Sequence, residues 1–317
     1  MPPFKPGQYL TFQLKNVSSG PDRSAVRGAI VRCYSLSDKP DERTYRVTIK
    51  RVPSPSNRPD LPAGVASTHF HDRVNVGDVL SVKAPAGNFY INANVDRPAV
   101  LIAGGIGVTP MISMLRCCLA EQPGRALHLY YGVRCGADHA FKGQLALLAA
   151  SNPNFRLNVV YSNPAPSDRA GADYQHTGYI NIELLRRTLP HGQHEFYVCG
   201  PPAMMESLVP AIVEWGVPVS DVHFEAFGPA TVRLPTTEQL VAITNELPDR
   251  YKVMVLLGAG AGLRLGEALG LGVEQVEFLP RQLRVERQLL TPSAGEPSFG
   301  KPKTPSSVRT VTSSTYG

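Results

Sequence analysis

The stretch PAVLIAGGIGVTPMISML, residues 98–115, decides the fold of the chain around it. Its residues 100–103 form a short apolar run, which is typical of a buried strand. Glycines then let the backbone pass close to a ligand, and Pro110 stands where the first turn of a helix tolerates proline. The stretch predicts a strand, a glycine turn and a helix in succession, and the helix N-terminus offers free N–H groups to a pyrophosphate. The glycines are Gly104, Gly105 and Gly107.

The rhythm of the sequence differs on the two sides of residue 98. Residues 4 to about 92 hold short alternating runs between Gly, Pro and Asp clusters, which predict strands, among them 9–14, 45–52 and 79–85, and are typical of an antiparallel β-barrel. From residue 98 to about 229, apolar runs alternate with helical runs, which predicts a parallel doubly wound α/β sheet. We therefore expect a multi-domain chain with a barrel domain over 1–95, an α/β domain over 96–232 and a third region over 233–317.

The composition bounds what the chain can be. A length of 317 residues suits two or three domains, and a hydrophobic fraction of 43% is enough for packed cores. The net charge of +6 is small for this length and does not indicate a nucleic-acid-binding protein. No apolar run approaches the roughly 20 residues of a membrane span, and the N-terminus lacks the order of a secretion signal. We expect a soluble cytoplasmic protein with no membrane partner. The five cysteines form no C-x-x-C pair and no iron–sulfur spacing, so no metal site is expected.

Taken alone, the GGIG turn is a weak signal, because it lacks the full G-x-G-x-x-G spacing. Seven further motifs accompany it. They are FKPGQYLTF (4–12), RCYSLSD (32–38), YRVTIKRV (45–52), PAGVASTHFHD (62–72), HAFKGQ (139–144), FYVCGPPAMM (196–205) and VHFEAFGP (222–229). In this order, residues 1 to about 230 resemble the ferredoxin-reductase superfamily, most closely the reductase part of flavohaemoglobins and of flavin/iron–sulfur electron-transfer reductases.

The resemblance implies an FAD-binding barrel that is truncated at its N-terminus, because relatives usually have one or two strands before the F-x-P-G-Q-Y motif. In RCYS, Arg32 would pair with the pyrophosphate, Tyr34 would lie against the ring and ribityl chain, and Ser35 would hydrogen-bond the flavin edge. An ordinary strand with an exposed arginine is the alternative interpretation.

Two further segments would contact FAD on the same resemblance. Ile49 and Lys50 would line its adenosine side, although a solvated lysine on a strand is equally ordinary. The GVAST segment precedes a short helix, and its N–H groups and hydroxyls suit the pyrophosphate, although the hydroxyls can also serve only to cap that helix. The implied contacts in this segment are Gly64, Ala66, Ser67 and Thr68.

The resemblance also implies a nicotinamide-binding site. NAD(P)H would bind to the glycine turn and the start of its helix, and to the loop that ends the EFYVCG strand. The implied contacts are Gly104, Gly105, Gly107, Thr109, Pro110, Cys199, Gly200 and Pro201. Glu225 and Phe227 would close the nicotinamide face of the flavin, with Phe227 as a stacking gate or, alternatively, as plain core packing. Ser35, Cys199, Glu225 and Phe227 are thus the predicted catalytic positions.

These residues imply an FAD-dependent NAD(P)H oxidoreductase that passes electrons to a separate haem or iron–sulfur protein. Such chemistry needs no protein nucleophile, since positioning of the two cofactors is the catalysis. The preference between NADH and NADPH stays open. Arg134 could meet a 2′-phosphate, whereas the nearby Asp138 would repel one, which favours NADH.

The third region opens with a capping box at residues 236–239, followed by a helix. The next apolar segment, 250–271, predicts two buried helices around a glycine turn, residues 273–290 predict strand, and the Pro/Ser/Thr/Gly-rich segment 291–317 predicts loop or disorder.

Residues 236–311 resemble the first half of a tyrosine-recombinase (phage integrase) catalytic domain. The resemblance lies in LLGAGAGLRLGEALGL (256–271), VEFLPRQLRVERQLL (276–290) and FGKPKTPSSVRTV (299–311). It implies Arg264 as a catalytic arginine, Glu267 as its acidic neighbour and Lys303 as the hairpin lysine. No H-x-x-R follows and no histidine follows His223. We therefore expect a truncated remnant without strand cleavage, which retains at most a weak DNA contact. A DNA-binding module and an inactive gene fusion are the rival hypotheses.

Overall fold

The structure is a computed structural model, which describes residues 1–14, 30–54, 60–227, 236–277, 282–290, 296–302 and 308–312. The chain divides into two compact units, Met1–Ala230 and Thr231–Gly317. Among the described residues, no helix has both the length and the apolarity needed to cross a membrane.

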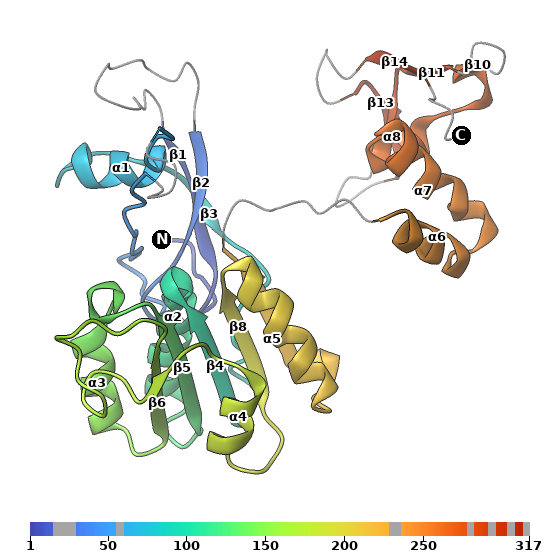
Figure 1. The fold of residues 1–317 in the computed structure, drawn as a ribbon. Helices are drawn as coiled ribbons and strands as arrows, with labels where there is room; N and C mark the ends of the chain where they lie inside the picture. Colours follow the sequence, from blue (N-terminus) through green and yellow to red (C-terminus); the bar gives the residue numbers. More distant parts are fainter. Residues whose placement is uncertain are drawn as a thin grey trace. The chain divides into compact units, whose positions relative to one another are not determined.

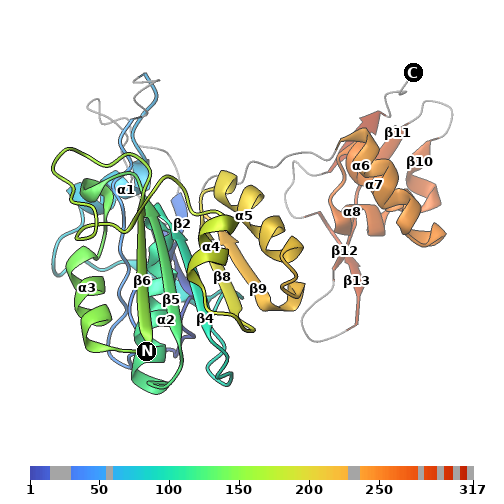
Figure 2. The same ribbon diagram turned by 60° about the horizontal axis from the view of Figure 1, so that its bottom comes forward.

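A parallel sheet with helices on both faces forms most of the first unit (Figures 1 and 2). Among the described residues its strand order is β7-β6-β5-β4-β8-β9, and every neighbouring pair is parallel. The strands are β4 (Ala99–Gly104), β5 (Leu127–Val133), β6 (Phe155–Tyr161), β7 (His176–Thr177), β8 (Glu195–Gly200) and β9 (Val222–Ala226). The helices are α2 (Val108–Glu121), α3 (Lys142–Ser151), α4 (Ile182–Thr188) and α5 (Pro202–Glu214), with short 3-10 turns at Gly105–Gly107, Gly136–Asp138 and Val219–Asp221. The prediction of a doubly wound sheet is confirmed.

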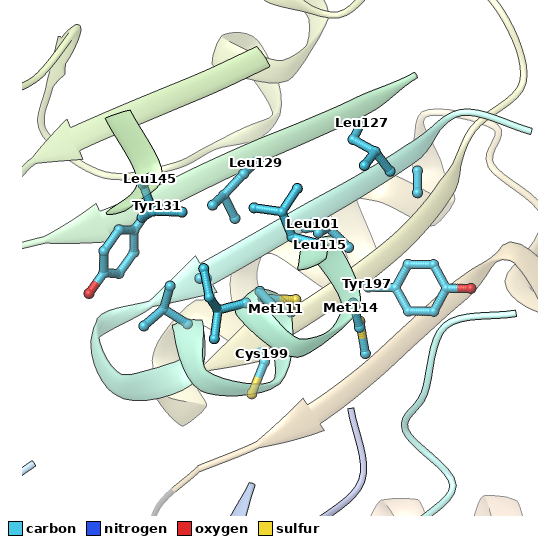
Figure 3. Packing of buried hydrophobic residues seen from close by; sticks show 14 of the residues in the cluster. Leu101, Met111, Met114, Leu115, Leu127, Leu129, Tyr131, Leu145, Tyr197 and Cys199 are labelled. Atoms are coloured by element: carbon cyan, nitrogen blue, oxygen red, sulfur yellow. The ribbon is translucent and has the colours of Figure 1, made fainter. Parts of the chain in front are cut away.

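Strand β4 is buried on both faces, which explains its unbroken apolar sequence. Side chains alternate along a strand, so Ala99, Leu101 and Ala103 face α2 and α3, whereas Val100 and Ile102 face α4 and α5. Figure 3 shows the first of these two cores, in which the α2 side chains pack against the sheet. The labelled members of this core are Leu101, Met111, Met114, Leu115, Leu127, Leu129, Tyr131, Leu145, Tyr197 and Cys199.

The N-terminal part of the first unit holds a second, antiparallel sheet. In the described residues its order is β2-β1-β3, formed by β1 (Tyr9–Leu14), β2 (Ile30–Ser35) and β3 (Ser81–Ala86), with helix α1 (Val65–Asp72) beside it. Leu10, Phe12 and Leu14 alternate inward from β1 and join Phe4, Leu36 and Ala66 in a small core. The antiparallel type is as predicted, although the described strands form an open sheet rather than a closed barrel.

The prediction of a strand over residues 45–52 is wrong. Only one isolated bridge, between Leu36 and Val47, ties this segment to β structure. Other partners take its backbone groups: the Ile49 carbonyl contacts the His71 ring at 2.9 Å, and the Val52 N–H donates to Ser67 Oγ at 3.2 Å. The apolar Tyr45 and Val47 do pack against the small core, but at Ile49 and Val52 the backbone groups contact side chains of α1 rather than a neighbouring strand.

The second unit contains three helices and short antiparallel strand pairs among its described residues. The helices are α6 (Thr237–Glu246), α7 (Asp249–Ala261) and α8 (Leu265–Gly270), followed by a 3-10 turn at Val273–Gln275. The strands are β10 (Val276–Glu277), β11 (Gln282–Val285), β12 (Gln288–Leu290), β13 (Ser298–Gly300) and β14 (Arg309–Thr312), paired as β10-β11-β14 and β12-β13. The predicted capping box is present, with Gln239 N donating to Thr236 Oγ1 and Thr236 N donating to the Gln239 side chain.

Two predictions for this unit are wrong. Helix α7 is not buried, since Val253 is 50% and Leu256 is 64% exposed. The reason is that the core of this unit is too small to cover the helix, because its buried apolar residues are only Leu263, Ala268 and Val285 in the described part. The segment 291–317 is not all loop, because β13 pairs with β12 and β14 pairs with β11. Local composition missed these strands because their partners lie about ten and about 27 residues earlier in the chain.

Candidate functional site

The glycine turn after β4 brings the start of α2 against the end of β8. Gly105 adopts a φ of +55°, and a side chain there would meet nothing within 4 Å, so the backbone faces open space. At Gly107 a Cβ would overlap the carbonyl oxygen of Cys199. Glycine is therefore required at position 107 for packing and at 105 for conformation. Gly104 is the last residue of β4 rather than part of the turn, while Thr109 and Pro110 lie in the first turn of α2, where Thr109 Oγ1 donates to the Ile106 carbonyl.

The ends of β8 and β9 form the next side of the site. Cys199 and Glu225 are register partners on these parallel strands, and the Phe227 N–H donates to the Gly200 carbonyl at 3.1 Å. Pro201 caps the N-terminus of α5. Burial raises the pKa of the Cys199 thiol well above its usual range, and the neighbouring Glu225 raises it further. Burial also raises the pKa of the Glu225 carboxyl. Cys199 is thus held as a neutral thiol rather than as a nucleophile.

Strand β2 carries the predicted flavin contacts. The Arg32 side chain is exposed and donates to the Val31 carbonyl at 2.8 Å. Tyr34 is half-buried with its ring edge-on to Phe12 and Phe70, and burial raises its pKa. Ser35, at the end of the strand, is buried. The three residues therefore present an exposed cation, an aromatic ring and a buried hydroxyl in sequence.

Helix α1 differs from the prediction, because Ala66, Ser67 and Thr68 lie within its first turns rather than before it. Gly64 is its N-cap residue. The Ser67 hydroxyl is engaged locally, since it donates to the Gly64 carbonyl and accepts from the Val52 N–H. Ser67 can therefore offer a ligand only its backbone N–H, which has no partner within a helix at that position.

Two predicted residues on the next segment are placed differently from one another. Ile49 lines an apolar hollow of about 490 Å³ between β1, β3 and α1, with Leu10, Phe12, Tyr45, Val47, Phe70, His71, Leu80 and Val82. The Lys50 ammonium instead binds the carboxylate of Asp138 at 2.9 Å. Asp138 also contacts Arg134 at 3.4 Å, and these cations hold the pKa of its carboxyl below the usual value. Arg134 and Asp138, whose opposing charges left the nucleotide preference open, thus neutralise each other.

Sequence reasoning missed a junction between β2 and α2. The Asp38 carboxylate binds Arg116 at 2.7 Å and Arg46 at 3.1 Å, and Ser113 Oγ donates to the Asp38 carbonyl at 2.6 Å. Asp38 closes the RCYSLSD motif, but its partners on α2 lie 75 and 78 residues further along the chain. No local pattern joins positions so far apart.

Three buried polar atoms at these positions have no hydrogen-bond partner in the described part of the structure. They are Ser35 Oγ, Thr68 Oγ1 and Glu225 Oε2. Buried polar groups are nearly always paired, so three such atoms on β2, α1 and β9 indicate a polar ligand. The exposed Arg32, the Tyr34 ring and the glycine turn add a cation, an aromatic surface and free backbone N–H groups. This donor set fits a flavin and a dinucleotide.

In the second unit, the residues of the integrase-like motifs form an ion-pair cluster. Glu267 is 1% exposed and binds Arg309 at 3.0 Å and Arg264 at 3.4 Å. These arginines hold the pKa of Glu267 below its usual value, Arg309 contributing most. Lys303 lies outside the described residues.

Comparison with known proteins agrees with the two parts of the first unit. Residues 3–91 match an oxidoreductase FAD-binding domain, and residues 101–209 match an oxidoreductase NAD-binding domain. A flavohemoprotein of Rhizobium meliloti is 35% identical over 226 residues, and one of Halalkalibacterium halodurans is 36% identical over 227 residues. These alignments cover 71% and 72% of this chain and 53% of each relative, so the chain spans about half the length of the curated relatives it matches.

Solved structures agree with this assignment. The flavohem-like FAD/NAD-binding domain of a nitric oxide dioxygenase from Vibrio cholerae superposes with a TM-score of 0.60 and 30% identity, over 71% of this chain and 86% of that one. A flavohemoglobin from Malassezia yamatoensis shares the fold, with a TM-score of 0.54 and 23% identity over 72% of this chain and 53% of that one. The chain belongs to the family of flavohaemoprotein-type oxidoreductases that pair an FAD-binding with an NAD-binding domain.

Proposed function

We propose that the chain is an FAD-dependent NAD(P)H oxidoreductase that passes electrons to a separate haem or iron–sulfur protein. The observation that carries this proposal is the set of three buried polar atoms, Ser35 Oγ, Thr68 Oγ1 and Glu225 Oε2, which lie on β2, α1 and β9 and have no partner among the described residues. When bound, a flavin accepts a hydride from a nicotinamide and releases electrons singly or in pairs. A haem acceptor agrees with the flavohemoprotein relatives.

The residues of the site divide between the two nucleotides. Arg32 and the N–H groups at the start of α1 would bind the FAD pyrophosphate, while Tyr34 and Ser35 would orient the flavin. The remaining contacts would bind the nicotinamide nucleotide or border the flavin. For the nucleotide these are Gly104, Gly105, Gly107, Thr109, Pro110, Gly200 and Pro201, and at the border they are Cys199, Glu225 and Phe227. Domain boundaries near residues 95 and 232 are part of the same proposal.

The chain contains five cysteines, and none of them is in a disulfide. Free thiols suit a reducing compartment, so we propose a cytoplasmic location.

The first test is the visible absorption spectrum of the purified chain, before and after anaerobic addition of NADH. We expect a flavin spectrum that bleaches on addition. A colourless protein that cannot be reconstituted with FAD would overturn the proposal.

A second test addresses the pyrophosphate contact. Arg32→Ala removes the exposed cation of β2 and is expected to lower FAD affinity by roughly tenfold, since hydrogen bonds to charged groups contribute about 1.5–3 kcal/mol. Arg43→Ala, at an exposed position on the same part of the chain, removes the same charge away from the site. Titration of apo-protein with FAD compares the two, and equal affinities would remove Arg32 from the site.

A second candidate function concerns the Thr231–Gly317 unit. We propose that it is an integrase-like segment that contacts DNA weakly and does not cleave it. The support is the cluster in which two arginines, Arg264 and Arg309, converge on the carboxylate of Glu267, with the Arg264 side chain 63% exposed. The test is retention of the full chain on duplex DNA as salt rises. Retention should weaken with salt and fall further in Arg264→Ala than in Arg250→Ala, whereas no retention at low salt would dispose of the proposal.

A further inference from the structure

Asp38 joins the flavin-binding strand to the nicotinamide-binding helix. We propose that Asp38 is a positioning residue, which sets the angle and distance between β2 and the start of α2 and thereby between the two nucleotides. This inference rests on the proposed oxidoreductase function and adds a residue that acts through the placement of β2 and α2.

The contacts that carry the inference cross between the two parts of the first unit. Asp38 Oδ1 accepts from Arg116 at 2.7 Å, and the Asp38 carbonyl accepts from Ser113 Oγ at 2.6 Å. Asp38 therefore binds α2 through both its side chain and its backbone. Ser113 is fully buried, and the Asp38 and Arg116 side chains are 26% and 25% exposed, so bulk water screens this junction only partly.

Asp38 and its partner Ser113 both lie close in the chain to proposed nucleotide contacts. It lies three residues after Ser35, the last residue of β2. Ser113 lies one helical turn after Thr109, which is in the first turn of α2. A shift at this junction is thus transmitted within one turn to the pyrophosphate-binding end of α2, and within three residues to the flavin-contacting hydroxyl.

Arg116 extends the junction to a third element. Its other terminal nitrogen donates to Gln144 Oε1 on α3 at 3.0 Å. The Lys50–Asp138 pair makes a second link between the two parts of the unit, but its side chains are 49% and 27% exposed. Because exposed pairs contribute little, we assign the alignment to Asp38 and Arg116 rather than to Lys50 and Asp138.

The test compares variants that lose different partners of one carboxylate. Arg116→Ala removes the partner on α2, whereas Arg46→Ala removes the partner on the flavin side and leaves the link to α2 intact. Each holoenzyme is reduced by NADH in a stopped-flow instrument. We expect the limiting reduction rate to fall roughly tenfold in Arg116→Ala and in Asp38→Asn, because even a misplacement of about 1 Å can lower a rate by about a hundredfold. The flavin content of both variants should be unchanged. Arg46→Ala should reduce at the parent rate.

A double variant and a measurement without cofactor complete the test. Asp38→Asn/Arg116→Ala should be no slower than either single variant, because all three remove the same ion pair. Amide hydrogen exchange of the apo-protein should rise about tenfold near Ser35 and at the start of α2 in Arg116→Ala but not in Arg46→Ala.

The outcomes separate this inference from the function on which it rests. Parent-like reduction rates in both Asp38→Asn and Arg116→Ala would overturn the positioning role while leaving the oxidoreductase intact. A parent protein that binds no flavin would overturn the proposed function, and the hydrogen-exchange comparison would still decide whether Asp38 couples β2 to α2.

Discussion

At the scale of single residues, Glu195 carries the most buried charge pair of the first unit's described part. Its carboxylate, 6% exposed, binds Arg125, whose side chain is fully buried, at 2.9 Å, and Arg97 at 3.1 Å. Tyr197 also donates to it at 3.2 Å. Glu195 begins β8, four residues before Cys199 at the end of the strand that borders the site. The cluster is therefore structural rather than catalytic.

Glu195→Ala is expected to destabilise the first unit by about 3–5 kcal/mol, because it leaves the Arg125 guanidinium buried without a counter-charge. Urea unfolding followed by fluorescence measures the loss. Asp221→Ala is the control, since its partner Arg97 is 36% exposed and can be solvated. A loss below about 1 kcal/mol for Glu195→Ala would show that the neutral oxygens to which Arg125 also donates are enough to stabilise its buried charge.

His128 makes stability depend on pH. It is 5% exposed, its Nδ1 has no partner among the described residues, and burial lowers its pKa to about 4. The pKa of His128 is near 6.5 in the unfolded chain and about 4 in the folded chain, so the unfolded chain binds more protons between these pH values. The free energy of unfolding is therefore highest above pH 6.5 and falls as the pH drops toward 4.

Replacing His128 by Phe should flatten this dependence by about 1.4 kcal/mol per pH unit between pH 6 and 4.5. Unfolding midpoints across that range, for parent and variant, provide the measurement. Parallel curves for the two proteins would mean that His128 takes up its proton without unfolding.

At the scale of elements, Gly107, the N-cap residue of α2, and Gly143, in the first turn of α3, offer a comparison. Gly107→Ala forces a Cβ against the Cys199 carbonyl and should push the start of α2 away from β8, with a loss of about 1–3 kcal/mol and weaker nucleotide binding. Gly143→Ala in α3 meets nothing within 4 Å and should stabilise by about 0.5–1 kcal/mol. Thermal unfolding and NADH titration of both variants check this, and a neutral Gly107→Ala would contradict the tight packing.

The same elements show what the sequence could predict. The β4–turn–α2 unit was predictable because its signals are local: an apolar run, glycines and a helix-compatible proline within 18 residues. Residues 45–52 alternate as a strand does, yet their backbone groups bond to His71 and Ser67 of α1. Lys50, for which the sequence left open a flavin contact and a solvated position, pairs with Asp138, 88 residues away. Long-range partners decided each of these cases, and periodicity does not reveal them.

At the scale of the whole molecule, the two units differ in the size of their cores. The first contains two clusters on opposite faces of the parallel sheet and a third beside the antiparallel sheet, whereas the second has one cluster with three buried apolar residues in its described part. Most of the stability of the chain therefore resides in the first unit.

Calorimetry of the full chain should resolve two transitions, with the second unit melting first. Addition of FAD should raise only the later transition, because a ligand stabilises the unit that binds it, by about 2.7 kcal/mol at a hundredfold excess over Kd. A single transition that shifts as a whole would mean that the units unfold together.

The double burial of β4 has a consequence for how the sheet keeps its alignment. Polarity cannot specify the register of this strand, because a slip by one residue would exchange one apolar face for the other. Side-chain volume can specify the register, because two alanines and one leucine face α2 and α3, while valine and isoleucine face α4 and α5. A volume difference of a few methyl groups therefore fixes the register of β4 and the position of the glycine turn that follows it. A repacking such as Ala103→Leu with Ile102→Ala would reverse the difference in side-chain volume at these two positions without changing the total number of apolar carbon atoms on the strand.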